Sequence, residues 1–261
     1  MSTMPSLFIS HGAPTLAITD SPARRFLQQL GESLPRPKAI LVASAHWETA
    51  GAPAVSLAAA PETIHDFGGF PRELHEMQYP APGSPDTAQA AAALLEQAGF
   101  SVGRHPSRGL DHGAWVPLSL MYPQADIPVA QVSIMRGASP QNHEKMGRAL
   151  AALRDQGVLV IGSGALTHNL YEFRGQPIDT EAQPWVREFA EWMKGALERG
   201  DRDALRNYRS LAPHAAKNHP TEEHLLPLYV AMGAGGEGAA ARQLHTSLEY
   251  GILAMDVYAF E

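Results

Sequence analysis

Cysteine is absent from this chain of 261 residues, which excludes disulfide bonds, thiolate nucleophiles and metal sites with sulfur ligands. Any metal ion must therefore be held by nitrogen and oxygen atoms. No apolar run approaches the roughly 20 residues that a membrane-spanning helix needs, and the first residues lack the basic-then-apolar order of a signal peptide. We expect a cytoplasmic protein with no membrane partner.

Clusters of basic residues are also missing. The formal net charge is −7, and the acidic residues that cause it are scattered along the chain rather than gathered in one block. Because binding to nucleic-acid phosphates needs clustered lysine and arginine, we expect no nucleic-acid partner. We expect a monomer or a small homo-oligomer that acts on a small molecule.

Apolar residues make up 44% of the chain, enough for a full core, and the length suits a single domain over residues 1–261. Serine followed by proline at Ser21, Ser84 and Ser139 predicts three helix starts, with serine as N-cap and proline at the first helical position. The expected helices begin at residue 22 and span 85–99, 140–157, 181–199, 202–210 and 222–232. The expected strands are 7–9, 39–42, 158–161 and 252–260.

Strands that alternate with helices predict an α/β fold with a central mixed sheet and helices on both of its faces. The stretch 66–84 is rich in proline and glycine and reads as a long loop. Long loops inside one domain are often lids or binding loops, so we expect this one to serve the functional site.

Histidines follow three of the predicted strands. His11 comes after strand 7–9, His46 after strand 39–42, and His168 after strand 158–161 and a glycine-rich turn. In open α/β sheets ligands bind beyond the carboxyl ends of the strands. The sequence therefore predicts a metal site at these strand ends, although a single histidine in such a place is often only a turn residue.

Two further histidines lie beside acidic residues. His224 follows Glu222 and Glu223 in the first turn of the helix expected at 222–232, where the positive end of the helix dipole favours an anionic ligand. His112 follows Asp111, and an imidazole beside a carboxylate suits proton transfer near neutral pH. The same pair also fits a purely structural hydrogen bond.

Seven short motifs occur in an order that resembles the class III extradiol ring-cleavage dioxygenases, in particular the subgroup similar to 4,5-DOPA dioxygenase. They are HGAP at His11, SAHW at His46, HDFGGFP from His65, YPAPGSP from Tyr79, DHGAW at Asp111, THN around His168 and PTEEHLLPL around His224. The resemblance implies an enzyme that opens a catechol-type, DOPA-like aromatic with O₂ at a non-haem Fe(II) centre and yields a ring-opened semialdehyde acid. Zn²⁺ is the other metal it implies, in the protein as purified or crystallised.

The resemblance also implies roles for individual residues. His11, His46 and His224 would hold the metal, with His168 as a fourth ligand or a catalytic group and His112 as the acid/base residue. Glu222 and Glu223 keep a site of two histidines and one carboxylate open. We assign substrate binding to Asp111, Asn169 and Trp47, although Asn169 also suits a turn cap and Trp47 a place in the core.

Two other functions are compatible with these residues. A zinc hydrolase would use the same histidines to activate a bound water, and it would stay active without O₂. A binding protein without catalytic activity can share the same scaffold. Loss of His112 or His168 would favour the binding protein, but both are present.

Overall fold

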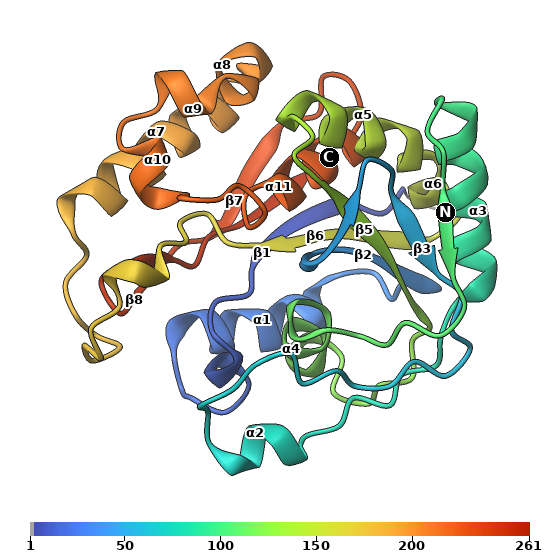
Figure 1. Ribbon diagram of the computed structural model, residues 1–261, viewed down its shortest axis with the longest axis horizontal. Helices are drawn as coiled ribbons and strands as arrows, with labels where there is room; N and C mark the ends of the chain where they lie inside the picture. The colour runs from blue at the N-terminus through green and yellow to red at the C-terminus, as the bar shows by residue number, and fades with distance from the viewer. Residues whose placement is uncertain (1–2) are drawn as a thin grey trace.

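A central sheet of eight strands organises the molecule, in the order β4-β3-β5-β2-β6-β1-β10-β7 (Figure 1). The computed structural model describes residues 3–261. The strands of this sheet are β1 Ser6–Ser10, β2 Ala39–Ala50, β3 Ala54–Ser56, β4 Gly103–His105, β5 Val129–Arg136, β6 Val158–Gly164, β7 Ala241–His245 and β10 Val257–Phe260. A separate pair joins β8 Leu248–Glu249 to β9 Leu253–Ala254.

The sheet is mixed, as the sequence predicts. Its four middle strands, β5, β2, β6 and β1, pair in parallel, whereas β10 pairs antiparallel with β1 and β7, and β3 pairs antiparallel with β5. The middle strands are almost wholly buried, which is typical of parallel strands covered on both faces. Their carboxyl ends lie together along one edge of the sheet.

Helices cover both faces of the sheet. Alternate side chains of each strand point to opposite faces, so one strand contributes to the cores on both sides. In β1, Leu7 and Ile9 pack in the core that also includes residues of α1 and α4. Phe8, between them, packs in the opposite core with residues of α11. Figure 1 shows α1 and α4 on one side of the sheet and α5 and α11 on the other. The predicted fold class is confirmed.

The helices differ in length from the prediction. The α-helices are α1 Pro22–Ser33, α2 Arg72–Glu76, α3 Pro85–Gln97, α4 His112–Met121, α5 Pro140–Leu150, α6 Ala152–Asp155, α7 Pro184–Glu198, α8 Arg202–Arg206, α9 Tyr208–Leu211, α10 Ala215–Asn218 and α11 Leu226–Ala234. Two 3₁₀ helices, η1 Pro14–Ala17 and η2 Leu170–Glu172, complete the set. No helix within residues 3–261 is long and apolar enough to cross a membrane.

Several predicted elements are interrupted. Segment 140–157 divides into α5 and α6, because the N–H of Ala151 bonds to the carbonyl three residues back, at Arg148, and the α-helical pattern stops there. Segment 202–210 divides at Asn207 into α8 and α9. Segment 252–260 divides into β9 and β10, and only β10 joins the main sheet.

The predicted serine caps are mostly correct. The hydroxyls of Ser21 and Ser139 accept hydrogen bonds from the backbone N–H groups of Arg24 and Asn142, as N-caps do. Ser84 makes no such cap, since its hydroxyl bonds to the side chain of Thr87 instead.

The helix expected at 222–232 begins four residues later, at Leu226, so His224 lies in the turn before α11 and not in its first helical turn. This turn packs tightly on β6. The backbone N–H of Ala165 donates to the carbonyl of His224 over 2.8 Å. A Cβ atom on Gly164 would lie only 2.1 Å from that same carbonyl oxygen. Glycine at the end of β6 therefore lets the turn that carries His224 reach the sheet.

We predict that Gly164→Ala lowers the free energy of unfolding by about 1–3 kcal/mol, because the added methyl group displaces the backbone of His224. Urea unfolding curves measure this change. Gly195→Ala is the matched control, since its Cβ would meet only the end of the flexible Arg199 side chain and α7 gains a better helix former. Equal stability of the two variants would contradict the tight approach of the turn to β6.

Candidate metal centre and its cavity

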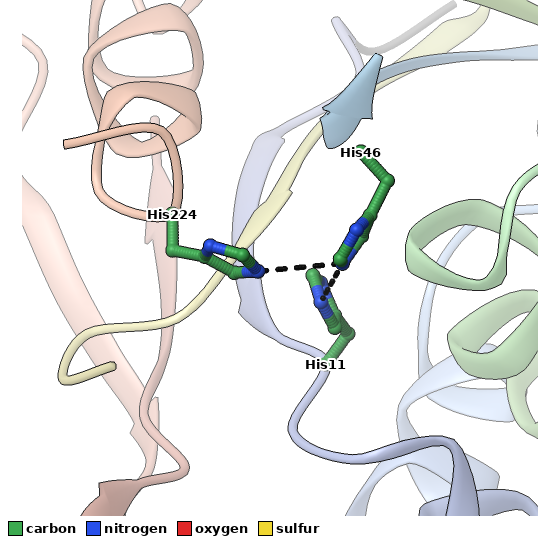
Figure 2. Close-up of side chains that lie close together, drawn as sticks. All are labelled: His11, His46 and His224. Carbon is green, nitrogen blue, oxygen red and sulfur yellow. Dashed lines mark hydrogen bonds between the residues drawn. The ribbon is translucent and has the colours of Figure 1, made fainter. Parts of the chain in front are cut away.

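Three imidazole rings converge at the carboxyl edge of the parallel strands. His11 directly follows β1, His46 lies in β2 and His224 lies in the turn before α11. The Nε2 atom of His46 is 3.0 Å from Nε2 of His11 and 3.3 Å from Nε2 of His224, as Figure 2 shows. The structure thus brings together three of the four histidines predicted as metal ligands.

The backbone around each ring explains this convergence. The N–H of His11 donates to the carbonyl of Gly164, which holds the end of β1 against β6. Strand β2 continues past His46 to Ala50, contrary to the prediction that it ends before His46. Its pairing with β5 shifts register between Ser44 and Glu48, and such a bulge re-aims the side chains within it.

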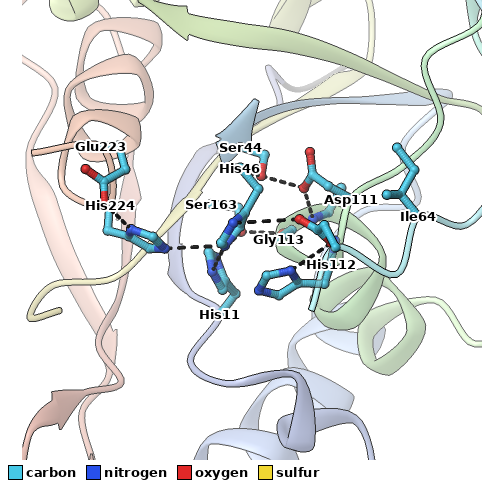
Figure 3. A network of polar contacts seen from close by, with 12 residues as sticks. His11, Ser44, His46, Ile64, Asp111, His112, Gly113, Ser163, Glu223 and His224 are labelled. Atoms are coloured by element: carbon cyan, nitrogen blue, oxygen red, sulfur yellow. Dashed lines mark hydrogen bonds and ion pairs between the residues drawn. The ribbon is translucent and has the colours of Figure 1, made fainter. Parts of the chain in front are cut away.

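Hydrogen bonds on the far side of two rings determine which nitrogen carries the proton. Nδ1 of His11 lies 3.0 Å from the hydroxyl of Ser163, whose own hydrogen is donated to the carbonyl of Gly113 (Figure 3). The hydroxyl must therefore accept from Nδ1–H of His11. Nδ1 of His224 lies 2.9 Å from Glu223, and a carboxylate only accepts. Both rings thus present an unprotonated Nε2 to His46.

Burial keeps these imidazoles neutral. Removal from water and the neighbouring histidine rings together lower the pKa of His46 to about 4, against the opposing effect of nearby aspartates. Burial and the same crowding of rings hold the pKa values of His11 and His224 well below the ordinary histidine value. Neutral imidazole is the form that binds metal ions.

The distances from Nε2 of His46 to Nε2 of His11 and of His224 suit a shared metal ion. Two imidazole nitrogens bound to one metal at about 2.1 Å are about 3.0–3.4 Å apart when the angle between the bonds is near 90–109°. The observed separations of 3.0 and 3.3 Å fall in that range. Metal-binding histidines usually donate their other ring N–H to a neighbouring acceptor, as His11 and His224 do here.

His112 is held by Asp66 and not by Asp111. One carboxylate oxygen of Asp66 accepts from the backbone N–H of His112 over 3.0 Å and from its Nδ1 over 2.9 Å. The other lies 3.7 Å from Nδ1 of His46. Burial alone raises the pKa of a carboxyl group, but the bonds from His112 outweigh it and lower the pKa of Asp66 to about 2. Asp66 is therefore an anion that contacts both rings.

His168 lies beside the three-histidine group and not within it. Its ring stacks on that of His224, with the ring centres 3.5 Å apart. Its nitrogen groups with Glu223 and His224, whereas His11, His46 and His224 form another possible metal-binding group that shares His224 with the first. Burial lowers the pKa of His168 to about 4. His168 therefore lies next to the three-histidine group, and its role as a fourth ligand or a catalytic group stays a prediction.

A cavity of about 560 Å³ opens over these rings. His46, His112, His168 and His224 line it together with Asp66. Most of the remaining wall is apolar and is formed by Phe67, Phe70, Leu170, Phe173, Ile252 and Leu253. A cavity of this size with few polar groups is typical of a site for a small organic molecule.

None of the three residues predicted to bind substrate is among the described residues that line this cavity. Asp111 is fully buried as the N-cap of α4, and its oxygens accept from Ser44, Arg108 and Gln131 and from the N–H of Ala114 (Figure 3 shows Ser44 and Asp111). It supports the bulge of β2 through these bonds.

Asn169 and Trp47 are likewise engaged elsewhere. The side chain of Asn169 accepts from the N–H of Tyr171, which caps η2, and donates to the carbonyl of Lys217. Trp47 is buried with the guanidinium of Arg108 4.9 Å from its ring centre. Asn169 therefore caps a turn and Trp47 packs in the core, which are the alternatives that the sequence offered for them.

Asp66, Glu223 and Ser163 contact the site but were not assigned these roles from the sequence. Asp66 opens the stretch 66–84, which was predicted to serve the site, but nothing in the sequence pairs it with His112. The adjacent Asp111 is the closer acidic neighbour in sequence. Glu223 was considered as a ligand, whereas the structure places its carboxylate on the outer nitrogen of His224.

Comparisons with a family model and with known proteins point to the same family. Residues 4–258 match the family described as the catalytic LigB subunit of aromatic ring-opening dioxygenase. The chain is 46% identical over 260 residues to a 4,5-DOPA dioxygenase extradiol of Beta vulgaris, covering 98% of this chain and 96% of the relative. It is 43% identical over 234 residues to an Escherichia coli K12 protein of the same name, covering 88% and 85%.

A solved structure agrees with this assignment. The crystal structure of an uncharacterized protein from Escherichia coli K12 matches with a TM-score of 0.81 and 36% sequence identity, covering 99% of this chain and 100% of that one. The resemblance inferred from the seven motifs is confirmed, and the chain belongs to the class III extradiol dioxygenases of the LigB family.

Proposed function

We propose that this protein cleaves the ring of a catechol, DOPA-like in its substituent, with O₂ at a non-haem Fe(II) ion held by His11, His46 and His224. The product is a ring-opened semialdehyde acid that contains both oxygen atoms of O₂. The observation that supports this proposal most is the convergence of three neutral imidazoles, two of which line a mainly apolar cavity. The names of the relatives support the reaction and the substrate.

His11, His46 and His224 would hold Fe(II) through three neutral nitrogens. Once bound, the ion would supply redox chemistry and would lower the pKa of the catechol hydroxyls. Ser163 and Glu223 keep the ligand nitrogens of His11 and His224 free of protons. The apolar wall limits access of water to the reacting groups.

His112 is the proposed base for a catechol hydroxyl. Its Nδ1–H is donated to Asp66, so Nε2 carries the lone pair that accepts the proton. The carboxylate of Asp66 then stabilises the imidazolium that forms, as an aspartate does beside a catalytic histidine elsewhere. His168 lies in the same cavity, stacked on His224, and is the proposed second group for proton transfer.

Anaerobic reconstitution of the metal-free protein with Fe(II), followed by O₂ and a panel of catechols that includes DOPA, tests the proposed function. We expect equimolar consumption of O₂ and catechol, with new visible absorbance from the ring-opened product. Tightly bound iron without O₂ uptake for any catechol would contradict the proposal. Hydrolysis of ester or amide substrates by the zinc-loaded protein without O₂ would instead support a zinc hydrolase.

We predict that Asp66→Asn slows turnover by about 10²–10⁴-fold and leaves metal content unchanged. The asparagine amide can donate to Nδ1 of His112, which moves the ring proton to Nε2 and removes the lone pair that the base needs. Oxygen uptake at saturating catechol and metal analysis of the purified variant measure the two effects.

Asp126→Asn is the matched control, because this aspartate pairs with Arg36 on the surface and does not line the cavity. It should keep the activity of the original protein. Undiminished turnover of Asp66→Asn would show that Asp66 does not serve His112. Loss of both bound metal and turnover in Asp66→Asn would indicate that Asp66 acts on His46 instead.

A further inference from the structure

The described side chains that line the cavity include a negative charge but no lysine or arginine to balance it. Within residues 3–261, the lining includes the carboxylate of Asp66 but neither lysine nor arginine. The described lining therefore offers no lysine or arginine cation to a substituent of the ligand.

Cations near the cavity are engaged outside it. The guanidinium of Arg108 bonds to Asp111 and to the carbonyl of His46, and it stacks on Trp47. The ammonium of Lys217 lies 4.8 Å from the ring centre of Trp185 and 4.0 Å from Glu172. Neither residue lines the cavity.

The apolar wall lies where a substituent of the substrate must go. The catechol oxygens belong at the three imidazoles, so the rest of the molecule extends toward Phe67, Phe173 and Leu253. A carboxylate there would lose water without gaining a partner, which is costly for an ionised group. The carboxylate of Asp66 would add repulsion.

We infer that the cavity selects catechols whose substituent carries no net negative charge and discriminates against catechols that bear a carboxylate alone. This inference rests on the proposed function. A DOPA side chain carries its own ammonium beside its carboxylate, so this carboxylate keeps a cationic partner when it leaves water and the substituent stays within the selected class. The volume of about 560 Å³ leaves room for a sizeable neutral substituent.

Binding to the zinc-loaded protein tests the inference without turnover, because zinc has no redox chemistry. The probes are 3-(3,4-dihydroxyphenyl)propanoate, its primary amide and 4-methylcatechol, measured by calorimetry at neutral pH. The acid and the amide have nearly the same shape and differ in charge. We expect the amide to bind at least about tenfold more tightly than the acid.

The three probes distinguish a failure of the charge selection from a failure of the proposed catechol site. If 4-methylcatechol binds and the acid binds as tightly as the amide, the charge selection is wrong while the catechol site stands. If none of the three binds to a protein that holds its metal, the catechol site is wrong and the charge selection with it.

Two variants locate the selection in the cavity. Phe173 lines the cavity and is 45% exposed, so arginine fits there without disturbing the core. Phe173→Arg should tighten binding of the acid by at least about tenfold and change binding of the amide little. Tyr171→Arg adds the same charge two residues away, at a side chain 78% exposed and outside the lining. Equal effects of both variants would overturn a selection made inside the cavity.

Discussion

Three converging imidazole nitrogens form the constraint on which this site depends: Nε2 of His46 lies 3.0 Å from that of His11 and 3.3 Å from that of His224, and the latter two carry no proton. Lone pairs that face one another repel unless a proton or a metal ion lies between them. Ser163 and Glu223 maintain this arrangement, because they take the only hydrogen that a neutral ring of His11 or His224 carries. Burial opposes relief by protonation, since it lowers the pKa of all three rings.

The surrounding fold meets this constraint with three backbone features. Parallel pairing aligns the ends of β1, β2 and β6 at one edge of the sheet. The bulge in β2 turns His46 toward the other rings, and Asp111 supports that bulge from beneath through Ser44. Gly164 allows the turn of His224 to approach β6. Each feature positions one of the three imidazoles, and none of these three histidines lies on a helix.

Local pattern in the sequence was enough to predict the mixed sheet with helices on both faces and the histidines that meet at its edge. Strand ends and the motif around His224 carry that information within a few residues. The partners of these histidines were not predictable in this way. Asp66 and His112 are 46 residues apart, and Ser163 and His11 are 152 apart. The adjacent Asp111 was the natural sequence choice for His112, but its position as N-cap of α4 directs it to other donors.

The central claim is that His11, His46 and His224 bind one metal ion. Two other groups, each of which shares one histidine with this set, could also hold an ion. They are His46 with Asp66 and His112, and His168 with Glu223 and His224. Anomalous diffraction at the iron absorption edge, from crystals grown anaerobically with Fe(II), distinguishes the three. The account predicts one peak within bonding distance of the Nε2 atoms of His11, His46 and His224. A peak in either of the other groups, with no density among these three nitrogens, would contradict it.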